Sequence, residues 1–175
     1  IKMSTRKANF ISLEELIDEI GSDVTRFFFI MRNMNSHLNF DLDVAKEESD
    51  INPVFYIQYA HARCCSILRR FEGDINSINT NVLNSLTDDL ESQIIRKLIV
   101  FPELISKCVD TLEPQNISNF LTELSSIFHS YYAKVKVIDS DSDKITHARI
   151  YLINAIRIVI RNGLNILGIT SPDKM

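Results

Sequence analysis

Apolar residues near the end of the chain recur every three or four positions. The series is Ile150, Ile153, Ile156, Ile160, Leu164 and Leu167. This spacing places them on one face of an α-helix. Three arginines, Arg149, Arg157 and Arg161, recur on a similar spacing and can line a second, basic face. Gly168 is a candidate helix stop, and Pro172 prevents a restart nearby. The pattern by itself predicts a buried terminal helix.

Helix-start signals organise the first part of the chain. Ser12 and Glu15 have the spacing of a capping box, which predicts a helix ending near Gly21. Asp23 can cap a second helix, running from Val24 to about Met34.

Three adjacent aromatics, Phe27 to Phe29, lie in that second helix and cannot share one helical face. We therefore expect this helix to be buried on more than one side. Residues 36–43 alternate polar and apolar types, which predicts a short extended piece followed by a helix capped by Asp41 or Asp43.

Longer helices are predicted over residues 53–175. Asn52 and Pro53 start one that runs to about Phe71. Residues 72–84, rich in Asn and Ser, predict a loop. The next helix should run from Leu90 to about Thr111 with a bend at Pro102, and another from the Pro114 region to about Val137. This half of the chain is therefore predicted to be an all-α bundle of four to five helices.

Composition is that of a globular protein, with 45% hydrophobic and 24% charged residues. The net charge of −4 argues against a uniformly basic surface for nonspecific nucleic-acid binding. No apolar run is long enough for a membrane span, and the first residues do not form a signal peptide, so we expect a cytoplasmic fragment of a longer chain. The cysteines are Cys64, Cys65 and Cys108. Their number and spacing suit neither a disulfide framework nor a Cys-x-x-Cys zinc site, so we predict reduced core thiols and no metal site.

The first residues carry a motif. Lys2-Met3-Ser4-Thr5-Arg6-Lys7-Ala8-Asn9 resembles the Lys-Met-Ser-Lys-Ser loop of class I aminoacyl-tRNA synthetases, with the continuation common in arginyl enzymes. The resemblance implies catalytic roles for Lys2, Met3, Ser4, Arg6 and Lys7, with Lys2 and Ser4 at the ATP phosphates. Cations there would stabilise negative charge that develops on the phosphates. Thr5 stands at the motif's second lysine, and Ala8 at the usual glycine.

The rest of the chain resembles the anticodon-binding part of arginyl-tRNA synthetases. Residues 146–149 are a loosened form of the Asp-Ala-Leu-Arg run, and residues 163–175 resemble the family's terminal segment. Residues 52–63 resemble its first anticodon-domain helix. The resemblance implies an all-α, helical bundle anticodon-binding domain over residues 52–175, preceded by a short, mostly helical tail of the catalytic domain over residues 1–51.

The resemblance also implies an RNA site. The family places a base-stacking tyrosine at Tyr132 and another anticodon contact near Lys136, and we expect Met175 to join them, backed by Arg149, Arg157 or Arg161. Gln58, His61 and Arg63 form a polar seam on one predicted helix. It can face the catalytic half or the tRNA, or it can be a satisfied core network.

The function implied is that of arginine–tRNA ligase. The full enzyme would join arginine to tRNA(Arg) through an arginyl-adenylate, using ATP and Mg²⁺. This chain lacks the His-Ile-Gly-His element, so we expect a monomer that binds tRNA(Arg) and the missing catalytic domain, holds no cofactor and catalyses nothing alone. Two alternatives remain open: a cysteinyl- or methionyl-type class I synthetase, and a standalone helical protein-interaction module.

Overall fold

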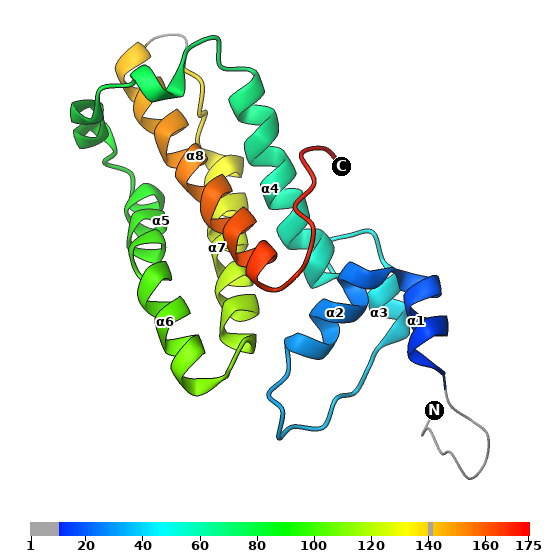
Figure 1. The fold of residues 1–175 in the computed structure, drawn as a ribbon. Coiled ribbons are helices and arrows are strands. Elements are labelled where there is room, and N and C mark those ends of the chain that lie inside the picture. Colours follow the sequence, from blue (N-terminus) through cyan, green and yellow to red (C-terminus); the bar gives the residue numbers. More distant parts are fainter. Residues whose placement is uncertain (1–10, 140–141) are drawn as a thin grey trace.

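The computed structural model describes residues 11–139 and 142–175, and this part of the chain is helical, with no strand among its elements (Figure 1). The prediction of an all-α protein is confirmed. The elements in chain order are α1 (Leu13–Ile20), α2 (Ser22–Ile30), α3 (Leu42–Lys46), α4 (Pro53–Arg69), η2 (Ile75–Ser77), η3 (Thr80–Ser85), α5 (Asp89–Ile99), α6 (Phe101–Thr111), α7 (Gln115–Lys134) and α8 (Asp143–Ile166).

The long helices form a bundle, and the three short N-terminal helices lie beside one end of it (Figure 1). Helices α7 and α8 occupy the middle of the bundle, between α4 on one side and the α5–α6 pair on the other. Their facing side chains form the core and are fully buried: Leu121, Leu124, Phe128, Ile153, Ile156 and Ile160. The apolar spacing seen at the end of the sequence is therefore the inner face of α8.

The helix starts follow local side-chain chemistry in three predicted places. Ser12 and Glu15 form a reciprocal capping box at α1. The carboxylate of Asp41 caps α3, and Asn52 caps α4. The Asn52 amide also donates to the carbonyls of Ala45 and Glu47, so this cap joins the two parts of the fold.

Helix α2 differs from its prediction. It begins at Ser22, directly after Gly21, and ends at Ile30 rather than near Met34. Asp23 lies in the first turn and is not the cap; its carboxylate instead accepts hydrogen bonds from the distant Thr170. The Asp23 carboxylate therefore binds a residue distant in the sequence and not the backbone N–H groups of its own helix. Of the three adjacent aromatics, Phe27 and Phe28 are buried, whereas Phe29 is 49% exposed.

Two further predictions were wrong in detail. The bent helix predicted around Pro102 is two helices, because α5 ends at Ile99 and α6 begins at Phe101 with Pro102 in its first turn, where a missing N–H costs nothing. The loop predicted over residues 72–84 contains η2 and η3. Ile75 and Ile78 in this stretch pack against the core, which anchors it to the bundle.

Two glycines shape the C-terminal part of α8. Gly168 has a φ of +69° and ends the helix as predicted, with the Ile169 N–H bonded to the Leu164 carbonyl and the Gly168 N–H to the Asn165 carbonyl. Gly163 lies against α7, where an added Cβ would sit 2.7 Å from a methyl group of Leu121. Its missing side chain lets the two helices approach closely.

Candidate nucleic-acid interface

A groove of about 350 Å³ runs between α4, the end of α7 and the C-terminal tail. It contains three of the residues predicted to bind RNA, namely Arg63, Tyr132 and Met175. The rest of its lining is Tyr59, Ala62, Ser66, Ile67, Arg69, Arg70 and Lys174. Residues from three segments far apart in the sequence thus meet at one surface.

Arg63 contacts two aromatic rings in this groove. Its guanidinium carbon is 4.8 Å from the centroid of the Tyr59 ring and 4.6 Å from that of Tyr132. The guanidinium also donates a hydrogen bond to the Tyr59 hydroxyl. Such cation–π contacts hold a long side chain in place. Tyr59, Arg63 and Tyr132 thus form an aromatic–arginine cluster in the groove.

The Tyr132 and Tyr59 rings each pack against a further ring. The Tyr132 ring packs on the buried Phe128, with centroids 6.2 Å apart. The Tyr59 ring stacks on His129 at 5.8 Å. The His129 imidazole is half-buried, and burial is the main cause that lowers its pKa, with Arg63 adding a smaller contribution.

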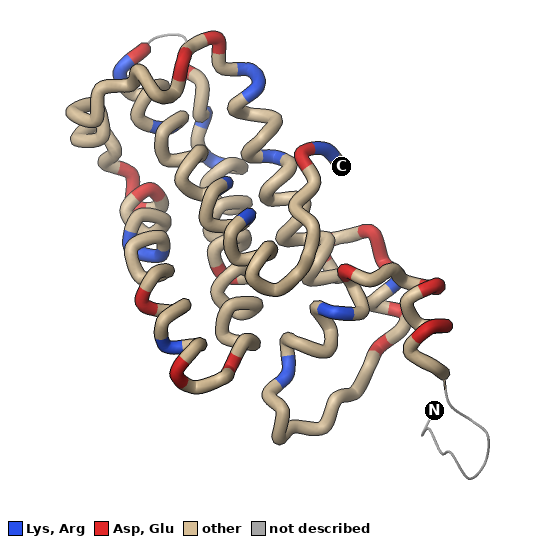
Figure 2. The backbone as a smooth tube through the Cα atoms, in the orientation of Figure 1, with Lys and Arg blue, Asp and Glu red and all other residues tan. Residues whose placement is uncertain are grey.

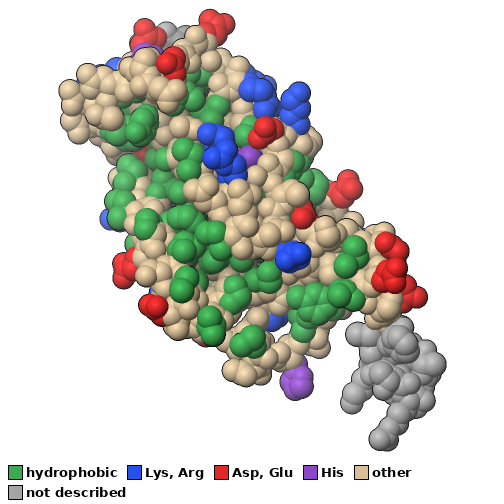
Figure 3. All heavy atoms as spheres, viewed as in Figure 1, with side chains coloured by type: hydrophobic (Ala, Val, Ile, Leu, Met, Phe, Trp, Pro, Cys, Tyr) green, Lys and Arg blue, Asp and Glu red, His purple; other side chains and the backbone are tan. Residues whose placement is uncertain are grey.

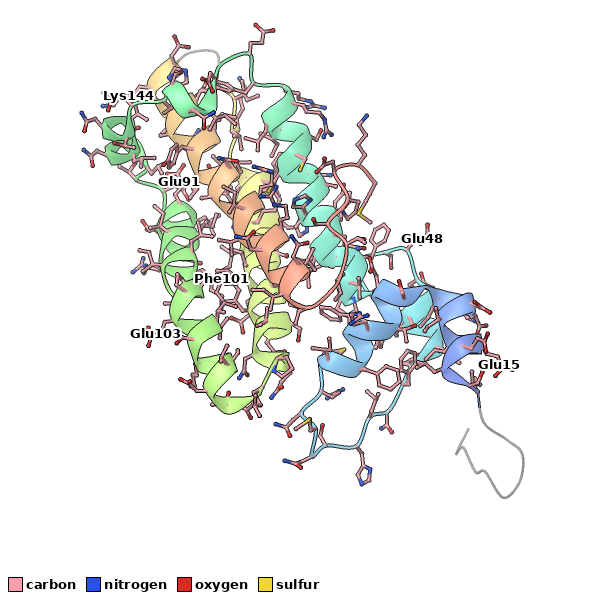
Figure 4. All side chains as sticks on the ribbon, viewed as in Figure 1. Glu15, Glu48, Glu91, Phe101, Glu103 and Lys144 are labelled. Atoms are coloured by element: carbon pink, nitrogen blue, oxygen red, sulfur yellow. The ribbon has the colours of Figure 1, made fainter. Side chains whose placement is uncertain are left out.

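Positive charge surrounds the groove. Arg69, Arg70 and Lys174 line it, and all three are exposed. In Figures 2 and 3, blue residues gather around the end of α4, the tail and α8. Acidic residues cluster over α1 and α3, and others lie along α5 and α6 and at the end of the bundle away from α1. Glu15 and Glu48 mark the acidic cluster over the short helices in Figure 4. A chain with a net charge of −4 therefore still has a local group of cations at the groove.

The C-terminal tail is held against α4 by polar contacts. The Gln58 amide donates to the Thr170 carbonyl at 3.0 Å and to Asp23 at 3.1 Å. Nδ1 of His61 lies 3.0 Å from the Pro172 carbonyl, and Arg69 donates to the carbonyl of Asp173. These bonds place Met175, two residues further on, at the groove.

Gln58 and His61 therefore bind the chain's own tail and do not line the groove. His61 is fully buried, and burial lowers its pKa. Of the two readings of the polar seam, the internal network describes Gln58 and His61, whereas Arg63 faces the groove.

Arg149 lies inside the bundle. Its Nε donates to Glu91 at 2.9 Å, and its Nη1 donates to the carbonyl of Lys136 at 2.9 Å. The Tyr131 hydroxyl donates to the same Glu91 carboxylate, which lies between α5 and α8 (Figure 4). Burial, helped by this carboxylate, raises the pKa of Tyr131. Arg149 is thus part of a buried network that joins three helices.

The other predicted cations lie outside the groove. Arg157 is bonded to Asn154 on its own helix, and Arg161 is exposed on α8. Lys136 is exposed just after α7, with its ammonium 4.0 Å from Asp139. The catalytic-loop residues Lys2, Met3, Ser4, Arg6 and Lys7 fall outside the residues that the structure describes.

Among the aromatic and charged groove residues, sequence reasoning missed Tyr59, Arg69, Arg70 and Lys174. A helical projection would have found Tyr59 and Arg70, because Tyr59, Arg63 and Arg70 are four and seven positions apart and share a face of the helix or its immediate continuation. Lys174 had no such signal, since its place depends on the path of the tail.

Comparison with known proteins adds a decisive observation. The sequence profile of the DALR anticodon binding domain matches residues 57–175. The chain belongs to this family. The matched range contains every residue of the groove, and the predicted domain start at residue 52 stays a prediction.

Relatives of this DALR domain are longer proteins. The arginine–tRNA ligase of Desulforamulus reducens is 44% identical over 181 residues, covering all of this chain but 32% of the relative. That of Salinibacter ruber is 42% identical over 176 residues, again with the whole chain and 31% of the relative. The chain therefore spans about a third of the length of the curated relatives it matches.

Solved structures agree on the fold. A Campylobacter jejuni structure named for an arginyl tRNA synthetase superposes with a TM-score of 0.86 and 26% identity, over the whole of this chain and 37% of that one. Thermus thermophilus arginyl-tRNA synthetase gives a TM-score of 0.75 at 22% identity, over 98% of this chain and 29% of that one. Within the part of the chain that is described, no helix combines the length and apolar character needed to cross a bilayer.

Proposed function

We propose that this chain is the C-terminal part of an arginine–tRNA ligase and that its groove receives the anticodon loop of tRNA(Arg). The observation that carries the proposal is the cluster of Tyr59, Arg63 and Tyr132, bordered by Arg69, Arg70 and Lys174. Proteins read single-stranded RNA loops by stacking splayed bases on aromatic rings and guanidinium planes. The groove contains aromatic rings and guanidinium groups, and its cations suit the phosphates.

Met175 completes the proposed site. Its side chain is 52% exposed and lines the groove together with Tyr132. A thioether packs well on a flat base, and if the chain ends here the terminal carboxylate accepts hydrogen bonds from base amino groups. The tail contacts through Gln58 and His61 support RNA binding by holding Met175 in place. Arg161 is the predicted cation on α8 best exposed for a phosphate contact outside the groove.

We infer the activity of the whole protein from the relatives' names and length. We propose that a catalytic domain missing here activates arginine with ATP and Mg²⁺ and transfers it to tRNA(Arg). Lys2, Ser4 and the neighbouring residues of the motif would contribute to the ATP site of that domain. Because the relatives are named arginine–tRNA ligases, the arginine family is favoured over a cysteinyl- or methionyl-type enzyme.

The test of the RNA site is a titration of labelled tRNA(Arg) at fixed salt, because phosphate contacts make affinity depend on salt. Tyr132→Ala should weaken binding by about 1–3 kcal/mol, the usual worth of one stacked base. Tyr132→Phe retains the ring and should bind nearly as well as the unaltered chain. Tyr151→Ala, which removes a partly exposed tyrosine outside the groove, is the matched control.

Specificity separates this function from general RNA or protein binding. A tRNA whose anticodon loop has been exchanged should bind at least about tenfold more weakly, since base contacts there carry the discrimination. Equal binding of both tRNAs, or equal binding by Tyr132→Ala and Tyr151→Ala, would show that the anticodon is read elsewhere. No binding of any tRNA would leave the helical interaction module as the better account.

A second experiment concerns catalysis. The 175-residue chain should show no arginine-dependent exchange between ATP and pyrophosphate, because it carries one loop of the proposed active site. Measurable exchange by the purified chain would contradict the proposal that catalysis requires the missing domain.

A further inference from the structure

Three potential metal ligands converge where the C-terminal tail crosses α4. One donor atom each from His61, Cys65 and Asp173 lies within 4.8 Å of the other two. The first two residues are four positions apart on α4 and so share a face of that helix. Asp173 arrives from 108 residues away. This is the one group of its kind among the described residues.

Two of the three ligand–ligand distances are close to those of a tetrahedral metal site. The Cys65 sulfur is 3.9 Å from Nε2 of His61 and 3.3 Å from Oδ1 of Asp173. Zinc bonds of about 2.0–2.3 Å at tetrahedral angles imply ligand–ligand separations of roughly 3.3–3.8 Å. The donor atoms of His61 and Asp173 lie within 4.8 Å of each other, so the exposed Asp173 side chain would have to move closer to His61 when a zinc ion binds.

The surroundings also prepare His61 for coordination. Its Nδ1 lies 3.0 Å from the Pro172 carbonyl. In the neutral ring, an Nδ1–H donating to this carbonyl leaves the Nε2 lone pair free. The Cys65 sulfur lies about equally far from the two ring nitrogens, at 3.8 Å from Nδ1 and 3.9 Å from Nε2. Metal-bound histidines commonly use their other nitrogen in this way, which fixes the ring orientation.

We propose that Nε2 of His61, the thiolate of Cys65 and a carboxylate oxygen of Asp173 bind Zn²⁺. On binding, Cys65 releases its thiol proton to solvent, a sulfur–zinc bond forms, and water takes the fourth position. His61 and Cys65 are buried, whereas Asp173 is exposed, so the ion can reach the site from the solvent side. The mixed nitrogen, sulfur and oxygen donors suit zinc and exclude Mg²⁺ and Ca²⁺, which take oxygen ligands.

A metal ion bound at this site would hold the C-terminal tail against α4. Asp173 lies between Pro172, whose carbonyl contacts His61, and Met175, which lines the groove. A metal bond at Asp173 therefore adds to the hydrogen bonds that hold this segment on α4. Arg69 and Arg157 act on Cys65 with positive charge that opposes an approaching dication, so the affinity should be below that of an all-cysteine structural site. The inference stands independently of the proposed RNA function.

The probe is Co²⁺, added to the untagged 175-residue chain in a reducing buffer and then displaced with Zn²⁺. A thiolate-to-cobalt charge-transfer absorption should appear and be lost as Zn²⁺ binds. Cys65→Ala should abolish the absorption, whereas Cys64→Ala, which alters the adjacent and also buried cysteine, should preserve it. Asp173→Asn should weaken the competition by Zn²⁺ at least about tenfold.

Asp173→Asn keeps the test decisive, because an exposed tail residue can be changed without unfolding the core. Asp110→Asn, at an exposed aspartate on α6, is its matched control. Hydrogen exchange of residues 170–175 should slow in Zn²⁺ but not in Mg²⁺, and not in Asp173→Asn. The proposal is overturned by the absence of the charge-transfer absorption, by its survival in folded Cys65→Ala, or by equal Zn²⁺ affinity in Asp173→Asn and Asp110→Asn.

Discussion

The guanidinium carbon of Arg63 lies 4.6 Å from the centroid of the Tyr132 ring, across the contact between α4 and the end of α7. Arg63 keeps a second ring, Tyr59, on its own helix at 4.8 Å. One side chain therefore fixes the relative positions of two aromatic rings from different helices. This makes the shape of Arg63, and not only its charge, part of the groove.

Arg63→Lys and Arg63→Gln separate these two contributions. Lysine retains the charge but lacks the planar group that contacts both rings. Arg63→Lys should therefore weaken tRNA(Arg) binding about tenfold while leaving its dependence on salt nearly unchanged. Arg63→Gln should weaken binding and also reduce the dependence on salt, because it removes one positive charge from the groove. Binding titrations at several salt concentrations measure both; a lysine variant that binds normally would mean that the stacking has no role.

Breaking the buried pair of Arg149 and Glu91 should destabilise the bundle. Their side chains are 17% and 1% exposed, so removing one leaves the other buried and unpaired. Arg149→Met should lower the free energy of unfolding in urea by about 3 kcal/mol, whereas Arg161→Met, at an exposed site on the same helix, should change it by less than about 0.5 kcal/mol.

A double variant tests the cause of that loss. Adding Glu91→Met to Arg149→Met removes the unpaired carboxylate and should recover part of the lost free energy. If the double variant is instead less stable than the single one by the full cost of Glu91→Met alone, the two residues are uncoupled and the buried-charge explanation fails.

The effect of Gly163→Ala on stability should depend on Leu121 and should change sign when Leu121 is replaced by alanine. A Cβ at Gly163 would lie 2.7 Å from a Leu121 methyl group, so Gly163→Ala should destabilise the chain by about 1–2 kcal/mol through overpacking. In a Leu121→Ala background the space is open, and the same change should stabilise by up to about 1 kcal/mol through helix propensity. Thermal or urea unfolding of the four chains gives the comparison, and an unchanged effect in the two backgrounds would exclude the contact.

Stability should decline in mild acid. Burial depresses the folded-state pKa of His129, so the unfolded chain binds a proton more readily. The stabilisation is complete above the ordinary histidine pKa of about 6.5 and is lost as the pH falls toward the lower folded value. Nearby Arg63 favours the neutral ring, and Asp50 opposes it.

His129→Gln isolates this contribution. Glutamine can still donate to the Tyr56 carbonyl, which lies 3.4 Å from His129 Nε2, but it does not titrate. The variant should lose less free energy of unfolding than the unaltered chain between about pH 7.5 and pH 5.5. Some dependence of the free energy of unfolding on pH should remain, because burial lowers the pKa of His61 as well. Identical slopes in the two chains would place the titrating group elsewhere.

Local signals predicted much of this fold because they act within a few residues. Ser12 and Asn52 cap their helices since each finds backbone N–H groups within its own first turn. The apolar spacing around Ile153 and Ile156 became the inner face of α8 for the same kind of reason. Asp23 was misassigned because its carboxylate binds Thr170, 147 residues away, and a local rule cannot detect that competitor.

The sequence by itself determined the helical class, the main helix starts, the family resemblance and the residue types for an RNA site. Only the tertiary structure decided which of those residues share a surface. In the folded chain, Arg149 binds the buried Glu91. Gln58 and His61 contact the C-terminal tail, and Arg63 packs against the Tyr132 ring. The physical reason is that helix periodicity fixes a side chain's direction around its own axis, whereas the partner it meets depends on how distant helices pack.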